Sequence, residues 1–175
     1  TPNAGTLLCR KAVSECGDIK DLEYDPASEI IITPGGMGAL SLFLSVIIDQ
    51  GDEVLIQDPQ WLNYASQVQF FGGNPVMVPV KAADGFVLKA DELEKKITEK
   101  TKLIMLNSPN NPTGCIIPIT ELKKIAELAK RYDLFVVSDE VYNSLYYSEK
   151  PISISTLPGM KERTVVINSL SKAFA

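Results

Sequence analysis

Short aliphatic runs that are apolar on both faces recur along this sequence and alternate with amphipathic segments. Residues 30–32 are three isoleucines, and residues 135–137 read PheValVal. A strand with one face in water alternates apolar and polar side chains, whereas strands that are apolar throughout need helices over both faces of their sheet. The sequence therefore predicts an α/β fold with three layers, α/β/α, in which the middle layer is a mostly parallel, mixed sheet.

The apolar runs predict six strands, at residues 29–33, 53–57, 75–80, 102–107, 134–138 and 164–168. Four helices are predicted between them, at residues 36–48, 61–71, 91–97 and 120–132. Asp91 and Glu94 resemble a capping box at the start of the third helix. No linker or repeat interrupts the 175 residues, which predicts one domain with a sizeable core.

Composition narrows the classes of function. The chain carries 17 Lys and Arg against 22 Asp and Glu, a net charge of −5, which argues against a nucleic-acid partner. Lys123, Lys124, Lys130 and Arg131 are spaced as the solvated face of a helix. The absence of histidine removes Ser–His and Cys–His nucleophile systems, and without a CxxC pair no metal site is expected.

Two further patterns bear on the cellular location. The three cysteines are sparse and odd in number, which favours free thiols in a reducing compartment. The longest apolar run, residues 40–48, is too short to span a bilayer, and no signal peptide is visible at the start of the chain. A cytoplasmic enzyme without a membrane partner is the expectation.

Three polar clusters follow predicted strands. They read SerProAsnAsnProThrGly at 108–114, SerAspGluValTyr at 138–142 and SerLeuSerLys at 169–172. Ligands of open α/β sheets bind at the carboxyl ends of the strands. We therefore expect the three clusters to form a ligand site at that edge of the sheet.

Lys172 and Asp139 would carry the charges of this site. A lysine held in a partly dry site beside a cationic cofactor loses its proton readily and becomes a nucleophile. A buried carboxylate at Asp139 is costly unless a cation meets it, and a protonated ring nitrogen would be such a cation. Alternatively, Lys172 is a surface residue and Asp139 caps the segment that follows it.

Tyr142 and Asn111 are the candidate neutral donors. Tyr142 lies three residues after Asp139, one helical turn away, so its hydroxyl can face the same pocket. Asn111 lies in a loop that two prolines and a glycine punctuate, and its amide could bind the same ligand oxygen. Tyr142 could instead be a half-buried aromatic residue and the loop a bare turn, although its polar heptapeptide is the most specific signal in the chain.

Two upstream segments add to the candidate site. The sequence ThrProGlyGlyMetGlyAlaLeu at 33–40 passes from a strand into an apolar helix, so the N–H groups of Gly36, Met37 and Gly38 could point at a phosphate. A glycine-rich segment of this kind is often only a tight turn. Trp61, the only tryptophan, follows the second predicted strand and could stack on a flat ring or fill the core.

Taken together, these residues resemble the class I/II aminotransferases, which are fold-type I pyridoxal phosphate enzymes, over essentially all 175 residues. The resemblance implies pyridoxal 5′-phosphate as the cofactor, with Lys172 as its Schiff-base lysine. It implies that Asp139 is the partner of the pyridine nitrogen and that Tyr142 and Asn111 bind the ring oxygen. Trp61 would stack on the ring.

The resemblance also assigns the phosphate group and the geometry of two prolines. Phosphate would be held by the backbone of Gly36 and Met37 and by the hydroxyl of Ser169, with Ser171 as a further donor. Cis peptide bonds are expected at Asp58–Pro59 and Asn111–Pro112.

An activity and its partners follow from the same resemblance. A transaminase exchanges an amino group between an amino acid and a 2-oxo acid, and the family's enzymes are homodimers. The family's phosphate-binding arginine beyond the lysine, its carboxy-terminal small domain and its amino-terminal arm have no counterpart in these 175 residues. We therefore expect the core of the large, cofactor-binding domain, with little or no activity alone. The alternatives are a pyridoxal phosphate-dependent lyase or synthase of the same fold, or the ligand-sensing domain of a transcription regulator.

Overall fold

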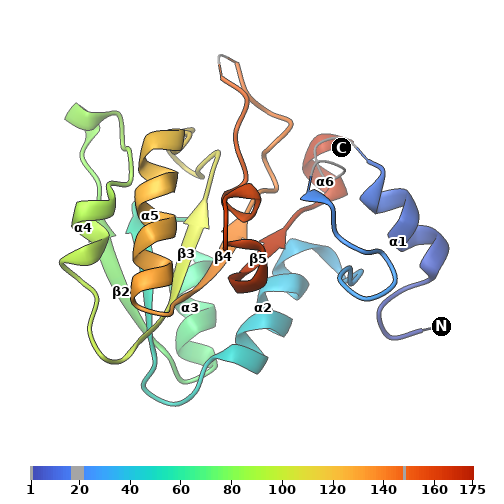
Figure 1. The fold of residues 1–175 in the computed structure, drawn as a ribbon, viewed down its shortest axis with the longest axis horizontal. Helices are drawn as coiled ribbons and strands as arrows, with labels where there is room; N and C mark the ends of the chain where they lie inside the picture. Colours follow the sequence, from blue (N-terminus) through green and yellow to red (C-terminus); the bar gives the residue numbers. More distant parts are fainter. Residues whose placement is uncertain (1, 17–21, 148) are drawn as a thin grey trace.

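The computed structural model describes residues 2–16, 22–147 and 149–175 (Figure 1). Its centre is a five-stranded sheet with the order β2-β1-β3-β4-β5. The strands are β1 (Glu53–Asp58), β2 (Asn74–Pro79), β3 (Thr101–Asn107), β4 (Phe135–Asp139) and β5 (Thr164–Ile167). Each neighbouring pair in this sheet is parallel. The predicted parallel sheet and the α/β class are therefore confirmed.

Helices cover both faces of the sheet and complete three layers (Figure 1). One face is covered by α2 (Gly35–Ile47) and α3 (Asn63–Phe70), and the other by α4 (Ala90–Glu94) and α5 (Ile119–Arg131). The short helix α6 (Leu170–Ala173) follows β5, and α1 (Leu7–Ser14) lies on the same side of the molecule. None of the helices in the described part of the chain has the length and apolarity needed to cross a membrane.

Alternate side chains of the central strands enter two separate cores. In β1, Leu55 packs under α4 and α5, while Val54 and Ile56 pack under α2 and α3. In β3, Ile104 packs on the side of α4 and α5, and Leu103 packs on the side of α2 and α3. All five side chains are at most 1% exposed. Because both faces of these strands are buried, their sequences are apolar without alternation, and this is the pattern that predicted them.

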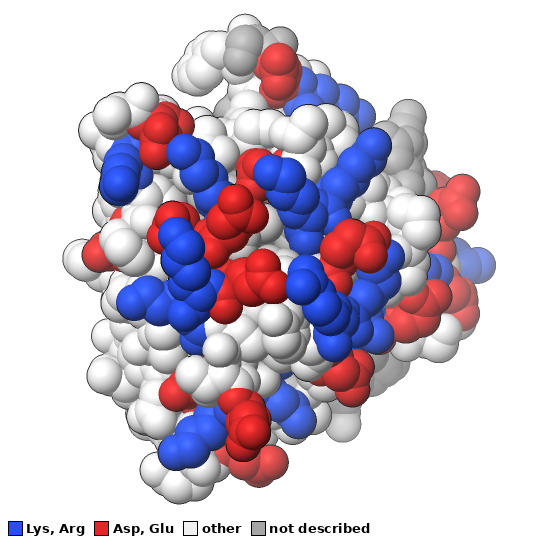
Figure 2. All heavy atoms as spheres, turned by 60° about the vertical axis from the view of Figure 1, so that its left-hand side comes forward, with Lys and Arg blue, Asp and Glu red and all other residues white. Residues whose placement is uncertain are grey.

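Helix α5 follows its predicted amphipathic pattern. Its buried residues are Leu122, Ile125, Ala126, Leu128 and Ala129. Its basic residues face outward, where Lys124 pairs with Glu121 at 2.8 Å and Lys130 pairs with Glu127 at 2.7 Å. Figure 2 shows basic and acidic side chains interspersed over the side of the molecule that carries α4 and α5. The basic residues of this helix therefore form its solvated face, as the sequence predicted.

The first predicted strand is not part of the sheet. Residues 30–33 have no regular secondary structure, and the N–H of Ile32 donates to the carbonyl of Ala4 at 3.1 Å. A cavity of about 370 Å³ is lined by residues 30–33 on one side and by β5 on the other. The five strands of the sheet include no residue of this segment, so the prediction of a strand at 29–33 was wrong.

The capping box predicted for α4 is also wrong. The helix begins at Ala90, and no side chain within it caps its first turn. The Glu121 carboxylate of α5 instead accepts a hydrogen bond from the Ala90 N–H at 2.9 Å. A neighbouring helix thus supplies the acceptor that Asp91 and Glu94 were expected to provide.

Candidate active site

A cavity of about 320 Å³ lies at the carboxyl-terminal edge of the sheet. Its lining consists of Gly35, Gly36, Met37, Trp61, Tyr64, Asn111, Asp139, Val141, Tyr142, Ser169, Ser171 and Lys172. The structure thus brings together every predicted site residue except Gly38. Cavities of this size at the ends of parallel strands are typical of small-molecule sites.

Parallel pairing explains why these distant residues meet. Asp139, the last residue of β4, is in register with Asn107 of β3 and with Ile167 of β5. The segments that follow the three strands therefore leave the sheet side by side. They carry Asn111, Tyr142 and Lys172, respectively.

Asp139 is a buried carboxylate whose donors are uncharged. It is 8% exposed. The Tyr64 hydroxyl donates to its Oδ2 at 2.6 Å, and the Val141 N–H donates to its Oδ1 at 3.2 Å. Burial raises the pKa of the Asp139 carboxyl, and these two hydrogen bonds offset only part of that effect. No described residue forms an ion pair with Asp139, so a cationic ligand group would satisfy it better than the protein does.

Tyr64 is a site residue that the sequence argument missed. Its side chain is 2% exposed, and burial raises the pKa of its hydroxyl, with the Asp139 charge as the next cause. The hydroxyl therefore stays protonated and acts as a donor to Asp139. The Tyr64 ring lies edge-on to the Trp61 ring, with centroids 5.3 Å apart and an interplanar angle of 81°. The spacing of three residues between Trp61 and Tyr64, one helical turn, was the available signal.

Tyr142, Asn111 and Lys172 are polar residues of the same cavity lining and lie near one another. The Asn111 Nδ2 donates to the Tyr142 hydroxyl at 3.4 Å. The Lys172 Nζ lies 5.6 Å from the centroid of the Tyr142 ring. Lys172 itself is exposed, so its amine can be reached from the cavity mouth.

The loop that carries Asn111 is fixed by a second asparagine. The Asn107 Oδ1 accepts from the Asn111 N–H at 2.7 Å, and the Asn107 Nδ2 donates to the Asp139 carbonyl at 3.0 Å. Asn107, 4% exposed, thus ties this loop to the end of β4. The cis peptide bonds predicted at Asp58–Pro59 and Asn111–Pro112 are confirmed, and Ser108–Pro109 is cis as well.

The amino terminus of α2 closes the cavity on another side. The N–H groups of Gly36 and Met37 belong to the first turn, where no intrahelical carbonyl is available to them. Gly38 is the fourth helical residue, so its N–H can bond back to the carbonyl of residue 34, and it does not line the cavity. Gly35 takes its place in the lining, with a positive φ of 74° that favours glycine.

Two serines complete the predicted set. Ser169 precedes α6, and its Oγ accepts from the Ser171 N–H at 3.3 Å. Both residues line the same cavity as the first turn of α2. Hydroxyl and backbone donors in this arrangement suit an anionic group, while the carboxylate, the amide and phenol donors and the indole suit a flat, cationic ring. The donor set therefore fits a phosphorylated heteroaromatic molecule.

Comparison with known proteins gives one consistent result. The family described as aminotransferase class I and II matches residues 2–175. An aspartate aminotransferase of Pyrococcus abyssi is 43% identical over 99% of this chain and 45% of its own length. Aromatic-amino-acid aminotransferase 2 of Thermococcus litoralis is 41% identical over 100% of this chain and 46% of its own length. The solved aspartate aminotransferase of Thermus thermophilus with maleate is 38% identical, with a TM-score of 0.95 over 100% of this chain and 45% of that one. The chain therefore spans less than half the length of these relatives.

Proposed function

The chain belongs to the class I and II aminotransferase family, and we propose that the protein containing it is a pyridoxal phosphate-dependent aminotransferase. It would exchange an amino group between an amino acid and a 2-oxo acid. One observation carries the proposal: Asp139 is buried with two uncharged donors, in the cavity that also contains Lys172, Tyr142 and Asn111.

Each residue of the cavity has a proposed task toward the cofactor. Asp139 keeps a proton on the pyridine nitrogen, because an ionised buried carboxylate stabilises a cation beside it. Tyr64 donates to Asp139 and keeps this carboxylate in place. Tyr142 and Asn111 donate to the ring oxygen, and Trp61 forms one wall against the ring.

The phosphate group and the chemical step use the remaining residues. The N–H groups of Gly36 and Met37 and the hydroxyls of Ser169 and Ser171 bind the phosphate. Pyridoxal phosphate, when bound, supplies an electron sink for the bond that breaks at the substrate α-carbon. Lys172 would hold the resting cofactor through its amine and, when this amine is free, would accept the substrate α-proton and donate a proton as a general acid.

We further propose that residues 1–175 are the core of the large, cofactor-binding domain of a cytoplasmic homodimer. The match to less than half of the relatives' length supports a larger protein. Leu42 and Val46 of α2 and Phe70 of α3 are 47%, 80% and 81% exposed, which suits a surface that is covered in the complete protein. The free cysteines suit a reducing compartment.

The test of the activity separates transamination from the other reactions of this cofactor. The complete protein is titrated with pyridoxal phosphate by absorbance, and aspartate or an aromatic amino acid, the substrates named for the relatives, is then added alone. An aminotransferase must accumulate one pyridoxamine phosphate per site, and a 2-oxo acid must reverse the change. A lyase releases the altered substrate without accumulating pyridoxamine phosphate. Failure of the protein to bind pyridoxal phosphate would refute both activities.

A further inference from the structure

Glu140, which directly follows Asp139, is the most enclosed carboxylate near the cavity, but it does not line it. Its side chain is 2% exposed. The hydroxyls of Ser138 and Ser153 donate to its Oε1 at 2.8 and 2.6 Å, and the Asn143 Nδ2 donates to its Oε2 at 2.8 Å. A buried carboxylate with three donors is satisfied by the protein itself.

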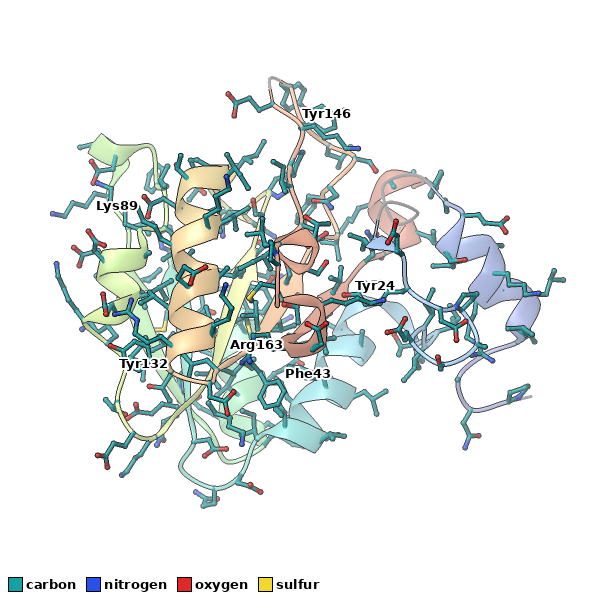
Figure 3. All side chains as sticks on the ribbon, in the orientation of Figure 1. Tyr24, Phe43, Lys89, Tyr132, Tyr146 and Arg163 are labelled. Carbon is teal, nitrogen blue, oxygen red and sulfur yellow. The ribbon has the colours of Figure 1, made fainter. Side chains whose placement is uncertain are left out.

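These donors come from three separate places in the chain. Ser138 belongs to β4, while Asn143 and Ser153 stand near the two ends of the loop formed by residues 140–147 and 149–153, here called the Tyr142 loop. The loop rises beyond the end of β4 (Figure 1), and Tyr146 lies near its far end (Figure 3). The Glu140 carboxyl therefore fastens both ends of the loop to the sheet.

The fastened end of the loop carries Tyr142. Asn143 follows it directly, and the Asn143 N–H also donates to the Glu140 carbonyl at 3.0 Å. The Leu145 N–H donates to the Tyr142 carbonyl at 2.8 Å and closes the next turn. Both sides of Tyr142 are thus held, while residues 145–147 are exposed. The position of the Tyr142 hydroxyl beside Asn111 depends on this turn.

We propose that Glu140 is a positioning residue for Tyr142: its carboxyl, bound to Ser138, Asn143 and Ser153, fixes the turn that presents the Tyr142 hydroxyl to the cofactor site. Glu140 acts through Asn143 and the backbone, on the opposite side of the strand end from Asp139. The inference rests on the proposed function, since that function gives the Tyr142 hydroxyl its task.

Two substitutions separate this role from a general loss of stability. Glu140→Ala removes all three contacts. Glu140→Gln keeps them, because the glutamine amide oxygen can accept from both serines. The glutamine amide nitrogen can donate to the Asn143 Oδ1 after the Asn143 side chain rotates, and the Asn143 Oδ1 has no hydrogen-bond partner among the described residues. Ile125→Ala is the matched control, since Ile125 is fully buried in the core on one face of the sheet and belongs to α5.

The first measurement needs no cofactor. Hydrogen exchange of the Asn143 and Leu145 amides is followed in the cofactor-free complete protein, because both amides are bonded within the turn. We expect Glu140→Ala to speed this exchange about tenfold or more, while Glu140→Gln stays within about threefold of the parent. Ile125→Ala should leave unchanged the ratio between the exchange rates of these two amides and those of the other amides in the protein. Exchange at the parent rate in Glu140→Ala would overturn the proposal. Should Glu140→Ala fail to fold, Ser138→Ala gives the same decision, because the Ser138 hydroxyl bonds Glu140 and no other described residue.

The second measurement connects the turn to the cofactor. The absorbance of bound pyridoxal phosphate is titrated with pH in the parent, in Glu140→Ala, in Tyr142→Phe and in the double variant. We expect Glu140→Ala to move the midpoint in the direction of Tyr142→Phe, and to add no further shift in the double variant. Additive shifts, or a parent-like midpoint in Glu140→Ala, would overturn the proposal. A parent protein that binds no pyridoxal phosphate would refute the proposed function instead, and the exchange data would still decide the role of Glu140.

Discussion

Replacing Asp139 by asparagine should stabilise the cofactor-free protein at neutral pH while it removes most of the activity. Burial raises the pKa of the Asp139 carboxyl above its ordinary value. The folded protein therefore holds this proton to a higher pH than the unfolded chain, whose carboxyl titrates near about 3.9. The stability that Asp139 contributes is fully present below the unfolded pKa and is lost as the pH rises through the folded pKa.

The contacts of Asp139 set the size of the effect. An asparagine can accept the Val141 N–H with its amide oxygen and donate its amide to the Tyr64 hydroxyl, so it keeps both partners. The advantage of Asp139→Asn over the parent should grow by at most about 1.4 kcal/mol per pH unit, the limit for one proton. Asp139→Ala leaves the hydroxyl of the buried residue Tyr64 without its partner. That variant should be less stable than Asp139→Asn by about 1–3 kcal/mol.

The assay is guanidinium denaturation of the cofactor-free complete protein between pH 4 and pH 8, at one protein concentration. The quantity of interest is the difference in unfolding free energy between Asp139→Asn and the parent. A difference that does not change with pH would show that Asp139 titrates alike in the folded and unfolded states, and the reasoning would fail. The amino-acid half-reaction of the same variant should slow by about 10²-fold or more. Near-parent rates would mean that Asp139 is only a cap.

Three further substitutions test other parts of the site. Lys172→Ala should abolish turnover and leave loose cofactor binding. Borohydride treatment of the parent, followed by peptide mapping, should find the cofactor on Lys172. A label on another lysine would contradict the assignment. Tyr64→Phe removes a hydrogen bond that lowers the pKa of Asp139, so the acid limb of the half-reaction profile should move to higher pH; an unchanged profile would show that Tyr64 is only a core residue. Gly35→Ala should cost about 1–2 kcal/mol because φ is 74°. Gly85→Ala is the control: its φ is 65°, and at both glycines an added Cβ would meet no atom within 4 Å, so it should cost the same stability. Only Gly35→Ala should weaken pyridoxal phosphate binding. Equal affinities in the two variants would refute a role for the first turn of α2.

The strands of the central sheet could be predicted because the burial of both faces is visible in each strand's own sequence. The two faces of β1 and β3 are buried, and continuous apolar runs are the direct consequence. The parallel order then places Asp139 at the carboxyl-terminal edge, next to the loops that carry Asn111 and Lys172. The predicted residues therefore make up nine of the twelve lining residues, and most of them belong to segments that directly follow a strand of the sheet.

The misses have in common that a partner distant in sequence decides the outcome. Residues 30–33 have the composition of a strand, but a strand needs a ladder partner, and the Ile32 N–H bonds the carbonyl of Ala4 instead of the sheet. The first turn of α4 has local acidic residues, but Glu121 of α5 is the acceptor. The sequence analysis did not single out Tyr64, because its hydroxyl meets Asp139, at 2.6 Å, across 75 positions of the chain.

Two adjacent carboxylates at the end of β4 have different roles, one structural and one toward the ligand. Asp139 and Glu140 are adjacent, both are buried, and burial raises the pKa of both carboxyls. Successive side chains of a strand point to opposite faces, so Asp139 and Ser138, whose hydroxyl bonds Glu140, face different surroundings. Glu140 meets three side-chain donors and is satisfied without a ligand, whereas Asp139 meets one side-chain hydroxyl and one backbone N–H, and faces the cavity. A carboxylate that the fold fully satisfies holds a loop in place, and one that the fold leaves short of partners is available to a cation.

The two carboxylates therefore predict responses of different size to the cofactor. Pyridoxal phosphate should raise the stability of Glu140→Gln as much as that of the parent, and should raise that of Asp139→Asn much less. Equal stabilisation of the two variants by the cofactor would show that the difference in partners has no bearing on function.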